Sequence, residues 1–228
     1  MSTKSQASVE QIMLAISEAI VDHRLPPGTR LIEAKLVKAL DANRNHVRAA
    51  LQRLATEDKV ITIVPNKGAV VAQPSVKEAK DIFEARRVVE RAVVSLAAEK
   101  LTPKMRNQLK KQLDKEKEAI NKQDKQRIIH ESGRFHTLLA EICGNDVLAD
   151  VLDGLIKRSS LIIALYQEMP EVKCSNDEHQ AIVDALFDGD LLKAQQLSDQ
   201  HMHTIEGRLL LDNVSHDVDL SEVFSSNV

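Results

Sequence analysis

The run NRNHVR at residues 43–48 carries the clearest chemical signal in the chain. It follows a polar break, and Asn43 is placed to act as an N-cap whose side chain accepts a hydrogen bond from a backbone N–H group. In the helix that begins there, the apolar residues fall on one face, so Arg44, Asn45 and Arg48 occupy the other. Guanidinium and amide groups pair with base edges and phosphates. The stretch therefore predicts a helix that binds in the major groove of DNA.

Three histidines point to a second kind of chemistry. His136, His179 and His201 each fall in a different predicted helix, beside residues expected to face inward. Neutral imidazoles that converge inside a helical bundle hold a divalent transition metal. No two of the three lie four residues apart, so spacing alone favours ordinary core or surface histidines over a metal site.

The helix that begins at residues 43–48 must be held in position by neighbouring elements. Residues 33–40 predict a short helix before the polar break, and residues 8–23 predict a longer one that packs beneath the pair. After Asp58 the pattern becomes β-branched, turns at Pro65-Asn66-Lys67-Gly68 and resumes at residues 69–71. This predicts a hairpin with Lys67 at its tip, and residues 30–32 can run extended beside it. Together these elements predict a winged helix-turn-helix.

The remainder of the chain reads as helix. Gln73-Pro74-Ser75 divides a DNA-binding domain, 1–74, from an all-helical domain, 75–228. The expected helices of the second domain cover roughly residues 76–100, 103–121, 125–143, 146–168, 176–187 and 190–211. Residues 212–228 read as a polar tail with one short turn at 220–224. In the first of these helices, the residues expected to face inward are Ile82, Phe83, Val88, Val89, Val93 and Leu96. The fold class is thus mainly α, a winged helix followed by a helical bundle.

Composition limits the possible functions. Residues 1–74 hold 10 Lys and Arg against 7 Asp and Glu, a net charge of +3, whereas residues 75–228 hold 21 against 27, a net charge of −6. A basic front and an acidic rear suit a DNA reader joined to a separate sensor. No apolar run approaches the roughly 18 residues of a membrane span, and two isolated cysteines do not form a disulfide framework. Glycine-rich phosphate loops and common hydrolase motifs are absent, so we expect no enzyme.

Residues 26–71 resemble the N-terminal domain of GntR-type bacterial repressors. The resemblance rests on PPGTRL, EAKLVKAL, NRNHVRAALQRLATEDKV and IVPNKGAVV. The sequence departs from the usual pattern at Asp41, Asn43, Asn45 and His46, so the operator of a relative does not transfer directly. We expect the DNA contacts to come from Lys35, Asn43, Arg44, Asn45, His46, Arg48, Lys67 and Gly68.

The rear half resembles the FadR-like, all-helical effector domain of the FCD type. Metal-binding members of this group have histidines where His136, His179 and His201 stand, together with an acidic residue at the position of Ser132. The resemblance therefore implies a divalent metal (Zn, Ni or Mn), with water, the effector or Glu131 completing the site. It also implies that an arginine faces the effector cavity, and Arg86 and Arg158 are the candidates. A structural ion pair is the alternative for Arg86.

These observations together predict a cytoplasmic, homodimeric transcription regulator. We expect a repressor that binds a short palindromic operator and responds to a small metabolite, such as an organic acid, with no membrane partner. A metal-dependent enzyme built on the three histidines and an architectural DNA binder without effector are the alternatives. The length of the second domain argues against the latter.

Overall fold

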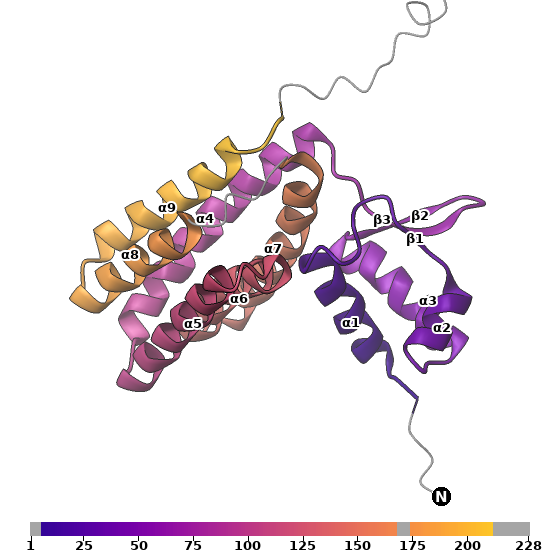
Figure 1. Ribbon diagram of the computed structural model, residues 1–228, viewed down its shortest axis with the longest axis horizontal. Helices are drawn as coiled ribbons and strands as arrows, with labels where there is room; N and C mark the ends of the chain where they lie inside the picture. Colours follow the sequence, from indigo (N-terminus) through magenta and orange to yellow (C-terminus); the bar gives the residue numbers. More distant parts are fainter. Residues whose placement is uncertain (1–5, 168–173, 212–228) are drawn as a thin grey trace, which may run out of the picture.

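The computed structural model describes residues 6–167 and 174–211, and Figure 1 shows their arrangement. An N-terminal unit of short helices and a small sheet lies beside a bundle of long helices. Helix α1 lies on the side of the N-terminal unit that faces the bundle. This is the mainly α architecture that the sequence predicts, a winged helix-turn-helix followed by a helical domain.

Local capping explains where the N-terminal helices begin. Helix α1 spans Val9–Val21 and starts at a capping box, in which the Ser8 hydroxyl and the Gln11 side chain each accept from the other residue's backbone N–H. Helix α2 spans Glu33–Ala39 and α3 spans Arg44–Arg53. The predicted cap of α3 is confirmed, because Asn43 Oδ1 accepts from the backbone N–H of His46 at 2.8 Å. Asp41 turns the chain between the two helices with a φ of 48°.

The wing is a three-stranded antiparallel sheet in the order β1-β3-β2. A single π-helical turn, η1 (Leu54–Asp58), leads from α3 into β2 (Ile61–Val64), which pairs with β3 (Gly68–Val71). Strand β1 is the short segment Arg30–Leu31 and adds to the far edge of β3, as expected from the sequence. Gly68 has a φ of +79°, the left-handed conformation that lets the hairpin turn close. The residues at the hairpin tip are exposed.

The bundle consists of helices whose ranges lie close to those predicted from the sequence. The helices are α4 (Val76–Lys100), α5 (Pro103–Asn121), α6 (Lys125–Cys143), α7 (Asp146–Tyr166), α8 (Cys174–Asp188) and α9 (Leu191–Gly207). Ser75, Thr102, Asp124, Asn145 and Asp190 each accept a hydrogen bond from a backbone N–H of the first turn. The hydrophobic core that these helices share includes Val93, Leu109, Phe135, Leu139, Leu152, Ile182 and Leu186.

Two sequence-based details are wrong. Val88, expected to face inward, has 69% of its surface exposed, because α4 is covered only along the stripe that includes Ile82, Phe83, Val89 and Val93. Asn176, the residue at which the helix 176–187 was expected to begin with an N-cap, lies inside α8, where its side chain donates to the backbone carbonyl of Leu113 at 3.2 Å. The expected turn at residues 220–224, the expected polar tail and the helix break that Pro170 predicts all fall outside the described residues.

Helix α7 joins the two parts of the molecule. Its Leu161 is buried in the hydrophobic core of the N-terminal unit, beside residues of α1 and α3. Lys157 forms an ion pair with Asp58 of η1 at 3.1 Å, and the Tyr166 hydroxyl donates to the carbonyl of Pro74 at 2.7 Å. No helix in residues 6–167 or 174–211 combines the length and apolar character needed to cross a membrane.

Candidate functional site

The first turn of α3 presents an exposed polar face. Arg44, Asn45 and Arg48 all point away from the core, which is formed by Val47, Ala50 and Leu51 on the opposite side of the same helix. The Arg48 side chain is 60% exposed and is held by Glu33 of α2 through two hydrogen bonds of 3.1 and 3.0 Å. Such a surface ion pair contributes little to stability, so the guanidinium can exchange Glu33 for another anion at low cost.

The other residues predicted to contact DNA divide into two groups. Lys35 on α2 and the wing-tip residues Lys67 and Gly68 are exposed. Asn43 and His46 instead have roles in the local structure. Asn43 caps α3, and His46 Nδ1 lies 3.0 Å from the carbonyl oxygen of Ala7 just before α1. These two side chains therefore position the start of α3, in addition to any contact with a partner.

The three predicted histidines meet inside the bundle. His136 of α6, His179 of α8 and His201 of α9 are 3%, 0% and 1% exposed, and one ring nitrogen of each lies within 4.8 Å of the other two. The Nε2 atoms of His179 and His201 are 3.1 Å apart. Phe135 stacks on the His179 ring at a centroid distance of 3.9 Å and closes one side of the group. Residues that are far apart in the sequence thus form a single cluster.

Each histidine is held from behind by a different carboxylate. His136 Nδ1 lies 2.9 Å from Glu90 Oε2, His179 Nδ1 lies 2.9 Å from Glu116 Oε2, and His201 Nδ1 lies 2.6 Å from Glu178 Oε2. The Nδ1 atoms therefore point outward to carboxylates. A carboxylate behind the outer ring nitrogen fixes the ring orientation and makes the inner nitrogen a better ligand, which is the usual support of a metal-binding histidine.

Burial controls the protonation of these groups. It lowers the pKa of His136 to about 3 and, with His201 nearby, lowers the pKa of His179 well below its ordinary value. Burial opposes the ionisation of Glu90, but the adjacent His136 and Arg86 hold the pKa of this carboxyl below its usual value. His136 is therefore neutral and donates its Nδ1–H to Glu90, which leaves the lone pair of Nε2 as its free coordinating atom.

Glu116 behaves differently, because burial raises its pKa to about 8. At neutral pH and without a metal, we therefore assign a proton to this carboxyl, which donates to His179 Nδ1. His179 Nε2–H then donates to His201 Nε2, and His201 Nδ1–H donates to Glu178. This chain of hydrogen bonds satisfies both histidines. Glu116 Oε1 is left buried without a hydrogen-bond partner among the described residues.

This donor set fits a divalent transition metal. Three neutral imidazoles suit Zn and Ni, and three protein ligands leave a position open for water or an exogenous ligand. Ser132 replaces the carboxylate expected at its position and lines a cavity beside His136. Glu131 is not placed to complete the group, because its side chain accepts from Gln112 Nε2 at 2.9 Å and faces Arg127. Within the part of the chain that the structure describes, the cluster contains histidines alone.

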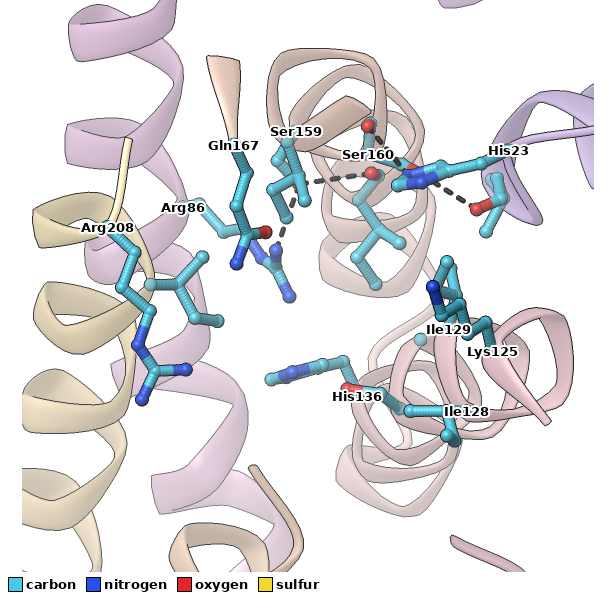
Figure 2. Close-up of a pocket in the computed structure, with 16 residues that line it drawn as sticks. His23, Arg86, Lys125, Ile128, Ile129, His136, Ser159, Ser160, Gln167 and Arg208 are labelled. Atoms are coloured by element: carbon cyan, nitrogen blue, oxygen red, sulfur yellow. Dashed lines mark hydrogen bonds between the residues drawn. The ribbon is translucent and has the colours of Figure 1, made fainter. Parts of the chain in front are cut away.

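The cavity beside His136 has a volume of about 180 Å³. Figure 2 shows Arg86, His136 and Arg208 around the opening, with Gln167 and Ser159 nearby. Arg86 is buried, and its guanidinium donates to Glu90 Oε1 and to Ser159 Oγ, each at 2.9 Å. It is therefore both a structural ion pair and part of the cavity wall. Apolar side chains, among them Ile128, Ile156, Ile163 and Ile205, form most of the remaining wall.

Arg158, which the sequence analysis named as a candidate to face the effector cavity, lies elsewhere. It does not line the cavity, and its guanidinium instead donates to Glu78 of α4 at 2.6 Å. The two serines that follow Arg158 along α7 do line the cavity. Arg208, near the end of α9, is the second arginine at the opening, and sequence reasoning did not single it out.

The carboxylates behind the histidines were also missed, although one signal was present. Glu116 lies in the helix expected over residues 103–121, whose many lysines indicate a surface position. It nevertheless follows Leu109 and Leu113 at helical spacing and so falls on the buried stripe. No local sequence pattern indicated that His23 contributes to the cavity wall, because its partner Ser160 lies 137 residues away in the sequence.

Comparison with known proteins identifies the family of the chain. The sequence profile described as "Bacterial regulatory proteins, gntR family" matches residues 8–71, and that of the FCD domain matches residues 81–204, more than half of the chain. The chain belongs to the GntR family and carries an FCD domain. The predicted family is therefore confirmed.

Similar GntR proteins are found in Escherichia coli strain K12. The chain is 28% identical to the HTH-type transcriptional repressor RspR over 146 residues, which is 64% of each chain. It thus spans just under two thirds of the length of that relative. It is also 28% identical to the HTH-type transcriptional repressor GlaR over 198 residues, covering 81% of this chain and 88% of GlaR. The structure of E. coli McbR/YncC has the same fold, with a TM-score of 0.80, 22% identity, and coverage of 87% of this chain and 95% of that one.

Proposed function

We propose that this GntR protein is a DNA-binding transcription repressor that responds to a small molecule. Residues 1–74 form its DNA-binding domain, and residues 75–228 form its effector-binding and dimerisation domain. The observation that carries the proposal is the exposed face of Arg44, Asn45 and Arg48 on α3, flanked by the exposed Lys67 of the wing. The similarity to RspR and GlaR, both described as repressors, supports repression over activation.

The active form is a homodimer in the cytoplasm, and neither a membrane nor catalysis has a place in its function. One winged helix reads only a few base pairs, and a net charge of +3 on residues 1–74 gives modest attraction to phosphates. Two copies related by a two-fold axis read a palindromic operator with the required affinity.

DNA binding is tested with a duplex selected by the full chain from a random 30-base-pair pool. Arg44→Ala should weaken binding to this duplex by about 1–3 kcal/mol, because a guanidinium paired with a base edge is lost. Lys111→Ala is the matched control, since it removes one exposed positive charge from α5 in the bundle. Fluorescence anisotropy at fixed salt measures both. Equal affinities for the Arg44 variant and the parent chain would show that α3 does not read the DNA.

We also propose that His136, His179 and His201 hold a divalent metal through their Nε2 atoms. Metal binding would release the proton from His179 Nε2 and leave Nδ1–H of the same ring donating to an ionised Glu116. Zn, Ni and Mn are the candidates, and the three neutral imidazoles favour Zn or Ni over Mn. The metal, when bound, would supply a positively charged coordination position next to the cavity for an anionic group of the effector. Glu90, Glu116 and Glu178 orient the three rings.

Elemental analysis of protein purified without a histidine tag tests the metal site. About one equivalent is expected for the parent chain and for His203→Ala, a variant that removes an exposed histidine from the same helix as His201. His179→Ala should lose the metal. If the parent chain holds less than roughly a tenth of an equivalent, unchanged in His179→Ala, the cluster is purely structural.

The effector that best suits the cavity is a small organic acid. The buried guanidinium of Arg86 can orient a carboxylate, while the isoleucine side chains accommodate a short apolar body. A thermal-shift screen of organic acids, amino acids and nucleobases tests this class. A response to nucleobases alone would exclude it.

A further inference from the structure

The cavity in the bundle is not enclosed by the bundle alone. Val21 and His23, which belong to the end of α1 and the loop after it, form part of its wall. Figure 2 shows His23 entering from the side of the N-terminal unit, across the opening from Arg86 and Arg208. A molecule that fills this space therefore touches the DNA-binding unit directly.

Ser160 of α7 fixes this part of the wall. His23 Nε2 lies 3.1 Å from both the carbonyl oxygen and the hydroxyl oxygen of Ser160, and the Ser160 hydroxyl donates to the carbonyl of Val21 at 2.9 Å. Because a carbonyl oxygen only accepts, we assign the proton of the imidazole to Nε2. His23 has a φ of 56°, so the chain turns sharply here and brings the ring back onto α7. We call the contacts among Val21, His23 and Ser160 the α1–α7 latch.

The latch is adjacent to the groups that would bind an effector. Ser159, the residue before Ser160, accepts from the Arg86 guanidinium at 2.9 Å. Arg86 in turn donates to Glu90, whose other oxygen accepts from His136 of the histidine cluster. A ligand that draws Arg86 or fills the space beside Ser159 therefore acts on the same turn of α7 that holds the DNA-binding unit.

The next residue along α7 strengthens this connection. Leu161 is 1% exposed and belongs to the hydrophobic core of the N-terminal unit, with Ile16 and Ile20 of α1. Three consecutive residues of α7 thus contact the cavity arginine, the end of α1 and the interior of the DNA-binding unit. A small rotation of this turn cannot leave all three contacts unchanged, because a packed core does not deform continuously.

We propose that the α1–α7 latch couples occupancy of the cavity to the setting of the DNA-binding unit, with the ligand acting by direct contact against Val21 and His23. This inference rests on the proposed function, since it describes how the effector site of a repressor is connected to the DNA-binding surface. The latched arrangement binds the operator. Filling the cavity displaces His23 from Ser160 and lowers operator affinity, and the size of such a coupling is typically between about fivefold and 150-fold.

The test needs no identified effector, because a side chain can occupy the cavity in its place. Ser132 lines the cavity from α6, so Ser132→Leu fills part of the space in the full-length protein. We expect Ser132→Leu and His23→Ala each to weaken binding of the selected duplex by about fivefold or more. The double variant should be no more than about twofold weaker than either single one, since both act on one latch. His203→Ala, which removes an exposed imidazole of α9 that does not line the cavity, should bind as the parent chain does.

Hydrogen exchange gives an independent readout. The backbone N–H groups of Asp22, His23 and Leu25 donate to carbonyls of α1, so an opened latch should accelerate exchange in residues 19–25 in both single variants. Circular dichroism establishes that each variant is folded, and Ser132→Val serves if the leucine variant is not.

The outcomes separate the inference from the proposed function. Fully additive losses of affinity, or an unchanged affinity for Ser132→Leu, would overturn the latch while leaving DNA binding in place. If the parent chain selects no duplex at all, the proposed function fails, and exchange alone decides the latch. Faster exchange at residues 19–25 in Ser132→Leu would then support a coupling between cavity and N-terminal unit, and unchanged exchange would refute it.

Discussion

Glu116 gives the most quantitative prediction, because its carboxyl is buried against His179 and titrates near neutral pH. Its pKa is about 8 in the folded chain against an ordinary value of 4.5. The folded state therefore binds a proton that the unfolded state has already released. This contribution to stability is complete below pH 4.5 and is lost as the pH rises through 8.

The magnitude follows from the two pKa values. Between pH 7 and pH 9 the folded carboxyl passes from mostly protonated to mostly ionised, while the unfolded one is ionised throughout. The free energy of unfolding therefore falls by about 1.4 kcal/mol over this interval, the equivalent of one pKa unit. His136 and His179, whose pKa values are lowered, contribute stability that is lost only as the pH falls below about 6.5, so they add little between pH 7 and pH 9.

Urea denaturation at pH 7 and pH 9, with a chelator and at one protein concentration, measures this loss. Glu116→Gln mimics the protonated carboxyl, because its amide can donate to His179 Nδ1 at every pH. The variant should therefore lack the loss of about 1.4 kcal/mol that the parent chain shows. Glu118→Gln on the same helix is the control: the pKa of Glu118, lowered to about 2 chiefly by its hydrogen bonds to Lys122 and Arg127, keeps it ionised throughout the interval. This control should retain the parental loss. An equal loss in the parent chain and in Glu116→Gln would refute the assignment of a proton to Glu116.

Two further predictions concern the histidine cluster and the start of α3. Glu178→Gln should weaken Zn binding by about 10- to 100-fold, because the His201 ring loses its charged acceptor. Competition with a chromogenic chelator measures the Zn affinity. An unchanged affinity would mean that Glu178 does not support His201 as a metal ligand. Asn43→Ala should lower the free energy of unfolding, measured in urea, by about 0.5–2 kcal/mol, because α3 loses its N-cap. Asn43→Asp should retain most of the stability, since its carboxylate can also accept from the backbone N–H. Equal destabilisation by both variants would contradict the capping role.

Much of the fold was predictable because its signals are local. Ser75, Thr102 and Asp124 cap helices at the positions where the sequence places a polar residue before an apolar periodic run. Such caps act over three or four residues, so a single sequence reveals them. Val88 was mispredicted for the opposite reason: periodicity identifies an apolar stripe, but only the neighbouring helices determine how wide a stripe is covered.

The candidate site shows the same division. The sequence identified His136, His179 and His201 through a family resemblance, whereas their spacing alone favoured an unremarkable role. Only the packing of the helices could show that the rings meet, because each comes from a different helix. Arg158 was placed in the wrong environment, since a one-residue change along α7 turns a side chain by about 100° and directs it to Glu78 in place of the cavity.

The sequence by itself determined the winged helix, the order and ends of most helices, and the exposed polar face of α3, because these depend on periodicity and capping within a few residues. The tertiary structure alone decided that Glu116 supports His179 from 63 residues away and that His23 closes the cavity against Ser160, 137 residues further along the chain. The physical reason is that hydrogen bonds and burial depend on which groups are close in space, whatever their separation along the chain. The environment that sets the pKa of Glu116 and the shape of the cavity exists only once α5, α7 and α8 have packed together.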